Sequence, residues 1–176
     1  MATPKLEDPN FSRTVVLLLE HGEDGALGVV LNRPTPLPLT DALPDWQHLG
    51  AAPAVVFAGG PVSADAVIAL ANGSPGPQDV GRGWVEVVGD VGTVDVGRDP
   101  DDVGSGVAAV RVFAGYAGWA HEQLAAEIRE HAWFVVGADP RDVFTPRPAR
   151  LWREVLRRQR APLSLFASYP DDPNTN

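Results

Sequence analysis

The sequence contains no cysteine, which excludes disulfide bonds, thiolate metal sites and cysteine nucleophiles. It also lacks any run approaching the roughly 18 consecutive apolar residues that a membrane-spanning helix needs. The opening segment, MATPKLEDPNF, has no apolar stretch of signal-peptide length. We therefore expect a cytoplasmic protein with no membrane partner.

Basic residues are scarce: 14 lysines and arginines stand against 23 acids, for a net charge of −9. An acidic surface repels phosphate backbones, so we do not expect direct binding to nucleic acid, and a protein partner is favoured. The exception is residues 147–160, which contain six arginines and one acid, Glu154. An acidic partner would have to bind through that segment.

The strongest apolar pattern is a pair of runs, residues 14–19 and 26–31, on either side of a segment with two glycines and four polar residues. This pattern predicts a β-hairpin. Neither run alternates apolar with polar residues, which is typical of strands covered on both faces. We therefore expect this hairpin to lie at the centre of the sheet.

The rest of the chain predicts more strands than helices. Strands are expected at 55–57, 66–70, 84–88, 92–96, 110–114 and 133–136, and helices after Thr40, after Asp99, at 121–132 and at 145–159. There is no regular βαβ alternation, internal repeat or linker. This order predicts one α+β domain over residues 1–165, with a largely antiparallel or mixed sheet and helices packed on its faces. Residues 72–83 are expected to form a polar loop, and residues 166–176 an extended, disordered tail.

Polar residues gather at the open end of the predicted hairpin, beside a glycine-rich turn. They either bind a ligand in a cleft or satisfy the backbone of the turns, and we favour the second interpretation. A histidine at the end of the first run is a further candidate, for which a solvated strand end is the favoured interpretation. The candidate residues of this region are Asn10, Arg13, His21, Asn32, Arg33, Gly59, Gly60 and Pro61.

Residues 113–136, FAGYAGWAHEQLAAEIREHAWFVV, form a second candidate region. Gly115 and Gly118 permit a tight turn into an amphipathic helix whose first amides have no Ser, Thr or Asp cap. These amides, with His121, either hold an anion or carboxylate ligand, or Gly118 caps the helix and the aromatic residues simply pack. We favour the second interpretation. The candidates here are Tyr116, Gly118, Trp119, His121 and Gln123.

No motif predicts a metal ion, a cofactor or catalytic residues. Residues 121–125 resemble half of a zinc-peptidase HExxH motif, but Ala125 replaces the second histidine. A Gly-x-Ser-x-Gly nucleophile motif and a phosphate-binding loop are both missing from the sequence.

The predicted last helix is amphipathic, and its basic face is either solvated or a surface for an acidic partner. That face carries Arg150, Arg153 and Arg157. A homodimer is a further possibility, through apolar surface around Trp46 and Leu49.

Taken together, several segments resemble the YqgE/AlgH family of bacterial proteins. They are Leu6–Phe11, Arg13–His21, Gly28–Pro34, Gly59–Val62, Gly115–Trp119, Gln123–Leu124, Glu127–Ile128 and Leu151–Arg153. The resemblance implies a single α+β domain with a compact sheet. Most members of that family have no assigned activity, and one branch is named as a proposed transcriptional regulator of exopolysaccharide synthesis. The resemblance supplies no catalytic residues.

The chain departs from the family pattern at four places. Family members usually begin with a Gly-x-Leu-Leu-Val-Ala strand, whereas only Met1–Thr3 precede Pro4 here, so we expect an upstream start or a shortened strand. Ala71 stands where a histidine is frequent, Glu122 where glycine is common and Ala125 where glutamate is common. A site built from those three groups would be impaired in this chain.

Two functional hypotheses follow. The first is a non-enzymatic protein that binds another protein and regulates gene expression indirectly, as the family resemblance implies. The second is a small enzyme or small-ligand binder with a cleft between residues 10–13 with 32–34, 59–62 and 115–123. The second hypothesis requires Asn10, Arg33 and His121 to converge on one point.

Overall fold

The computed structural model describes residues 1–73, 83–103 and 106–170 of the chain. Its strands are β1 (Val16–Gly22), β2 (Gly25–Val30), β3 (Pro34–Pro38), β4 (Val55–Ala58), β5 (Val62–Gly73), β6 (Val85–Val88), β7 (Val91–Val94) and β8 (Val107–Ala120). Its α-helices are α1 (Leu39–Ala42), α2 (Gln123–Arg129), α3 (Pro140–Val143) and α4 (Leu151–Arg157). Short 3₁₀ helices are η1 (Pro44–Leu49), η2 (Pro100–Asp102), η3 (Pro148–Arg150) and η4 (Leu163–Ser168). The predicted α+β class is confirmed.

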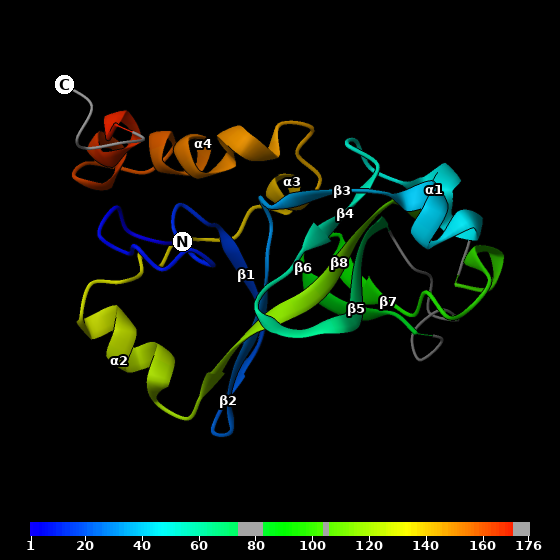
Figure 1. Cartoon of the computed structure of the whole chain (residues 1–176), viewed down its shortest axis with the longest axis horizontal. Helices are drawn as coiled ribbons and strands as arrows, with labels where there is room; N and C mark the ends of the chain where they lie inside the picture. Colours follow the sequence, from blue (N-terminus) through cyan, green and yellow to red (C-terminus); the bar gives the residue numbers. More distant parts are fainter. Residues whose placement is uncertain (74–82, 104–105, 171–176) are drawn as a thin grey trace.

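β8, with 14 residues, is the strand around which the sheet is built (Figure 1). The main path of the sheet is β1-β2-β8-β5-β7-β6, and every neighbouring pair along it is antiparallel. β4 adds a parallel pairing with β8 and an antiparallel pairing with β3. The expected mixed, largely antiparallel sheet is therefore present.

The hairpin β1-β2 is confirmed, with Gly22 opposite Gly25 at its turn. Its expected central position is wrong for β1, because among the described residues β1 pairs only with β2 and lies at the edge of the sheet. The apolar run predicts a strand covered on both sides, yet the side chain of Leu18 is 40% exposed. An edge strand with the composition of a central strand requires a separate explanation.

The strands that are covered on both faces are β5 and β8. Leu70 and Phe113 belong to the core cluster that includes four buried residues of α4. Their neighbours in sequence, Ala69 and Val112, belong to a second cluster that contains Trp46 of η1. Because successive strand residues point to opposite faces, helical elements cover the sheet on both sides. Figure 1 shows α4 on one side, above β1 and the N-terminal segment.

Glycines in and beside β8 permit close backbone contacts and do not form the predicted turn into a helix. Residues 115–119 continue β8 instead of turning into a helix. A Cβ on Gly60 would lie 2.2 Å from the carbonyl of Tyr116, and a Cβ on Gly59 would lie 2.2 Å from the carbonyl oxygen of Gly115. Glycine is therefore needed where the connection from β4 to β5 crosses β8.

Several predicted boundaries are also wrong. α4 begins at Leu151 instead of Thr145, because the residue before Pro148 is held out of the helical region, with φ −125° and ψ 59°. α1 is preceded by Pro38 and not capped by Thr40, and β3 and α3 were not predicted. Trp133 forms only an isolated bridge, to Ala2, where a strand was expected.

Two expected irregular segments are only partly described. The polar loop falls mostly on residues 74–82, and the end of the tail on residues 171–176, both outside the described residues. Residues 166–168 of the expected extended tail are helical, as part of η4. The predicted strands at 84–88 and 92–96 are confirmed as the hairpin β6-β7.

Candidate functional site

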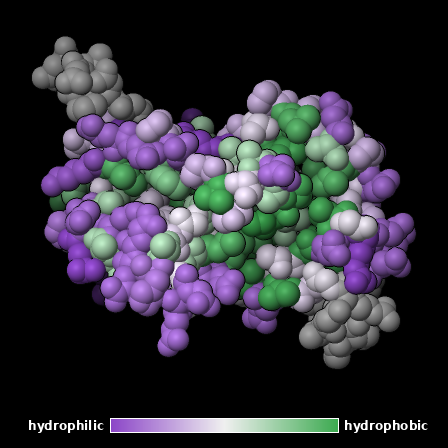
Figure 2. Space-filling view, turned by 60° about the horizontal axis from the view of Figure 1, so that its bottom comes forward, coloured by the Kyte–Doolittle hydropathy of each residue, from purple (hydrophilic) through white to green (hydrophobic). Residues whose placement is uncertain are grey.

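Several large apolar side chains are exposed to solvent. Figure 2 shows hydrophobic residues gathered over the middle and right of one face, while the left is mainly hydrophilic. The exposed large apolar residues are Leu18, Leu37, Val67, Val85, Val135, Leu165 and Tyr169. Two of them, Leu18 and Val135, border a cavity.

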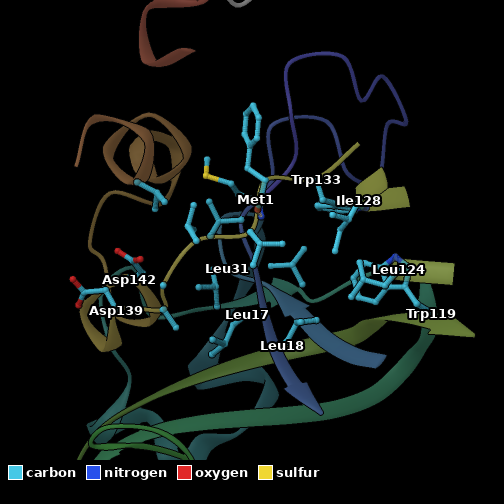
Figure 3. A pocket seen from close by; sticks show the side chains of 18 residues that line it. Met1, Leu17, Leu18, Leu31, Trp119, Leu124, Ile128, Trp133, Asp139 and Asp142 are labelled. Atoms are coloured by element: carbon cyan, nitrogen blue, oxygen red, sulfur yellow. Dashed lines mark hydrogen bonds between the residues drawn. The ribbon is translucent and has the colours of Figure 1, made fainter. Parts of the chain in front are cut away.

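This cavity is an apolar cleft of about 190 Å³, which we call the β1 cleft. It is lined by Val15–Leu18 of the β1 region, the segment 133–139, and side chains from α2, α3 and α4 (Figure 3). Leu17, Leu31 and Val155 at its base are buried, and Val135 at its rim is 74% exposed. The cleft is thus an apolar groove beside the edge strand β1.

The N-terminal residue, Met1, lines the β1 cleft. The amide of Ala2 donates to the carbonyl of Thr14 at 2.9 Å, and Met1 and Phe134 exchange hydrogen bonds of 2.8 Å in both directions. Burial lowers the pKa of the Met1 amino group to about 5, so this group is neutral at pH 7. Residues 1–3 therefore lie between Thr14, just before β1, and the segment 132–134.

An aromatic cluster fixes α2 beside the β1 cleft. Oε2 of Glu127 accepts hydrogen bonds from the indole N–H groups of Trp119, at 3.0 Å, and Trp133, at 2.7 Å. Oε1 of Glu127 accepts from Gln123 at 2.9 Å, and Phe11 packs against both indoles. This carboxylate is the acceptor for two nearly buried donors, which is a structural task.

Two carboxylates lie at one end of the β1 cleft, across from Trp119 and Leu124 (Figure 3). Asp142 is buried and accepts two hydrogen bonds from Arg158, one of them 2.6 Å long. The Arg141 guanidinium, 2.7 Å from Asp139, lowers the pKa of that carboxyl to about 2. Each acid is thus already paired with an arginine.

Arg111 of β8 is a buried arginine that no sequence pattern predicts. Its side chain is 2% exposed and lies over the ring of Phe57, 4.3 Å from the centroid. It donates to the carbonyls of Ala52, at 2.6 Å, and Thr145, at 3.1 Å. Burial lowers the pKa of Arg111 to about 10, which keeps it charged at pH 7. This residue joins β8 to the loops before β4 and η3.

The predicted cluster at the open end of the hairpin is formed, but its polar groups bind backbone. The Asn32 side chain accepts from the amide of Val15 at 3.0 Å and donates to the carbonyl of Arg13 at 2.9 Å. Arg33 donates to the carbonyl of Ser12 at 2.6 Å, and the backbone of Asn10 donates to Asp8. The favoured interpretation, that these residues satisfy turns, agrees with these contacts.

Gly59 also lies at this open end. Its amide donates to the carbonyl of Ala114, and its carbonyl accepts from Val30, both at 2.8 Å. Gly59 therefore links β2 to β8 through its backbone, and the exposed Pro61 follows next to Gly60. Arg13 adds a cation–π contact with Trp152, with its guanidinium carbon 4.9 Å from the ring centroid.

His21 and His121 lie elsewhere, near the turn of the hairpin. Gly25 pairs with Ala120, so His121 follows β8 at that end, and its ring contacts the carbonyl of Glu23. Arg33 follows the opposite end of β2, and the five steps between Gly25 and Val30 alone span roughly 17 Å. Asn10, Arg33 and His121 therefore do not converge, and the predicted three-segment cleft is not formed.

The other candidates of the second region are divided between β8 and α2. Tyr116 and Gly118 lie within β8, and Trp119 belongs to the Glu127 cluster. Gln123 begins α2 and accepts from the amide of Ala120 at 3.0 Å, which ties the start of the helix to the end of β8. Gly118 does not cap this helix, because its N-cap residue is Glu122.

The predicted basic face of α4 is partly engaged within the protein. Arg150 and Arg157 are exposed, whereas Arg153 donates to the carbonyl of Ala167 at 2.7 Å. Trp46 is 1% exposed and packs in the second core cluster, and the partly buried Leu49 packs against the same cluster, so Trp46 is not part of an exposed surface. A homodimer stays a prediction.

Within the described ranges, no group of three or more His, Asp or Glu side chains is placed to hold a metal ion. No helix in the same ranges is both long enough and apolar enough to cross a membrane.

Comparisons with known proteins agree with this architecture. Over its whole length the chain is 53% identical to a UPF0301 protein of Streptomyces coelicolor and 44% identical to one of Thermobifida fusca, and it covers 92% of each. The crystal structure of protein DIP2367 from Corynebacterium diphtheriae is similar, with a TM-score of 0.89 and 32% identity over 96% of this chain and 89% of that one.

A second solved structure and a family model complete the comparison. The solution structure of the AlgH protein from Pseudomonas aeruginosa gives a TM-score of 0.68 and 31% identity, over 98% of this chain and 92% of that one. The model of the AlgH-like family matches residues 1–164. The chain therefore belongs to the AlgH-like family, as the motifs near its hairpin indicated.

Proposed function

We propose that this protein is a non-enzymatic binding protein of the cytoplasm. It would regulate gene expression indirectly, by binding a protein partner. The β1 cleft carries this proposal, because its lining is apolar and the acids at its end are paired with arginines. An apolar cleft with its charges already neutralised suits the burial of an apolar segment better than acid–base chemistry on a polar substrate.

Charge supports a protein partner over nucleic acid. With a net charge of −9, the chain repels a phosphate backbone, and its basic residues are concentrated near α4. A role in gene expression, which the YqgE/AlgH resemblance implies, would then be indirect. A gel shift by the purified protein that persists at moderate salt would contradict this part of the proposal.

Matched surface variants test the proposed partner site. Val135 borders the β1 cleft and is 74% exposed, while Val85 is 64% exposed and lies outside it. Affinity capture from native cells should recover a partner with the wild type and with Val85→Glu but lose it with Val135→Glu. Equal recovery by both variants would place the partner site elsewhere, with Arg150 and Arg157 of α4 as the next surface to test.

A further inference from the structure

Positive charge in this acidic protein is concentrated in one short stretch. Residues 147–160, which include η3 and α4, contain six arginines and a single acid, Glu154, for a local charge of +5. Because the whole chain carries −9, the remaining residues carry −14. An anionic group near the molecule is therefore attracted to this stretch and repelled by the rest of the surface.

Arginines elsewhere in the described part of the chain are held by acceptors within the protein. Arg98 and Arg141 pair with aspartates, at 3.4 and 2.7 Å. The others donate to backbone carbonyls: Arg13, Arg33, Arg111 and Arg129. A guanidinium group without an acceptor is thus the exception in this molecule.

Three arginines on and beside α4 are such exceptions. The side chains of Arg150, Arg157 and Arg160 are exposed, and none has a hydrogen-bond acceptor or an ion-pair partner within the described residues. Arg150, which immediately precedes α4, and Arg157 are seven residues apart, so they lie on one side of the helix, about 10 Å apart along its axis. We call these three residues the α4 arginine surface.

The α4 arginine surface lies opposite the core and the β1 cleft. The other side of α4 is buried, and it places Leu151, Trp152, Val155 and Leu156 in a core cluster. Of these residues, Val155 lines the β1 cleft. Figure 1 shows α4 at the margin of the molecule, with the N-terminal segment and the sheet below it. The surface is therefore separate from the cleft.

We propose that the α4 arginine surface binds a short, carboxylate-rich segment of a partner protein. Guanidinium groups and carboxylates form paired, charge-assisted hydrogen bonds, so acidic side chains suit these arginines better than neutral groups do. A DNA duplex fits less well, because it is longer than this strip of about 10 Å and would extend over the surface that carries −14. This inference goes beyond the β1 cleft, and neither site requires the other.

The probe is a fluorescent, N-acetylated peptide of six glutamates. We expect saturable, one-to-one binding in an anisotropy titration at low ionic strength, and no binding of the matching glutamine peptide. The double variant with Arg150→Gln and Arg157→Gln should bind the glutamate peptide at least about tenfold more weakly. Equal binding of the two peptides, or no saturable binding of the first, would overturn the proposal.

A matched double variant separates the surface from the effect of net charge. Arg98→Gln with Arg129→Gln changes the net charge by the same amount at two exposed arginines that have acceptors of their own. We expect this control to weaken binding by less than about twofold, because both positions lie outside the proposed surface. Equal loss in the two double variants would overturn the proposal.

Three further measurements identify the occupant. A DNA duplex that binds as tightly as the peptide, and is lost in the Arg150 and Arg157 variant, would overturn a protein partner. Asp171 and Asp172 follow the described residues, and peptide binding only after both are replaced by asparagine would assign the surface to the chain's own end and overturn the proposal. Val135→Glu should bind the peptide as the wild type does, even if it loses the partner of the proposed function. A tenfold loss in Val135→Glu would overturn the placement on α4.

Discussion

Glu122 occupies a backbone conformation that suits glycine better than any residue with a side chain. It precedes α2 with φ 57° and ψ −8°, and it stands where the YqgE/AlgH resemblance places a common glycine. The chain therefore turns from β8 into α2 at a strained residue, in place of the predicted glycine turn at 115–118.

Replacing Glu122 by glycine should stabilise the protein. We expect Glu122→Gly to raise the free energy of unfolding by about 0.5–1 kcal/mol, since relief of the left-handed strain exceeds the added freedom of the unfolded chain. Urea denaturation measures this. Glu130→Gly is the matched control, because Glu130 has φ −80° and should lose stability on substitution. Equal losses in both variants would contradict the prediction.

Asp139 provides a test of the electrostatics at the end of the β1 cleft. Its pKa is lowered from 3.8 to about 2, chiefly by the hydrogen bond from Arg141. Because the folded pKa is depressed, the pair contributes stability above pH 3.8, and that contribution is lost as the pH falls through about 2. An NMR titration of Arg141→Ala should show the Asp139 pKa rising towards 3.8, while Arg129→Ala leaves it near 2. An unchanged pKa in Arg141→Ala would contradict this assignment.

At the scale of elements, one carboxylate of α2 accepts hydrogen bonds from β8 and from the segment that follows α2. Glu127 accepts from Trp119 on β8 and from Trp133 beyond the helix, and both indoles are 6% exposed. The amphipathic pattern of residues 121–132 predicts the helix but not this task, because nothing in the pattern separates Glu127 from the solvent-facing Glu130.

Removal of this carboxylate should loosen α2. We expect Glu127→Ala to lower the free energy of unfolding by about 2–3 kcal/mol, because two nearly buried N–H donors lose their acceptor. Glu130→Ala, an exposed neighbour on the same helix, should change it by less than about 0.5 kcal/mol. Denaturation curves for the two variants provide the comparison, and equal effects would show that the indole hydrogen bonds add nothing.

Other elements show where sequence reasoning succeeded and where it failed. The hairpins β1-β2 and β6-β7 were predicted because glycine turns lie between short apolar runs, which is local information. The position of β1 was not predicted. Its apolar run indicates that the strand is covered by other residues, but not which part of the chain covers it. Arg111 was missed for a similar reason: its acceptors, Ala52 and Thr145, lie far away in sequence.

At the scale of the whole molecule, the main path of the sheet has two edge strands, β1 and β6. The β5-β7-β6 side ends in a short strand, whereas the β1 side ends in an apolar strand beside a cleft. The predicted ligand site failed because its residues were divided between the two ends of β2. The only sequence feature that points to the β1 cleft is the apolar run of β1, and such a run predicts a central strand instead.

Hydrogen exchange of the β1 amides tests this account most directly. In the free protein, the outward amides of Val16 and Leu18 should exchange much faster than that of Leu17, which pairs with Val29 of β2. Outward amides of Val16 and Leu18 that exchange as slowly as that of Leu17 would contradict the assignment of β1 as an edge strand.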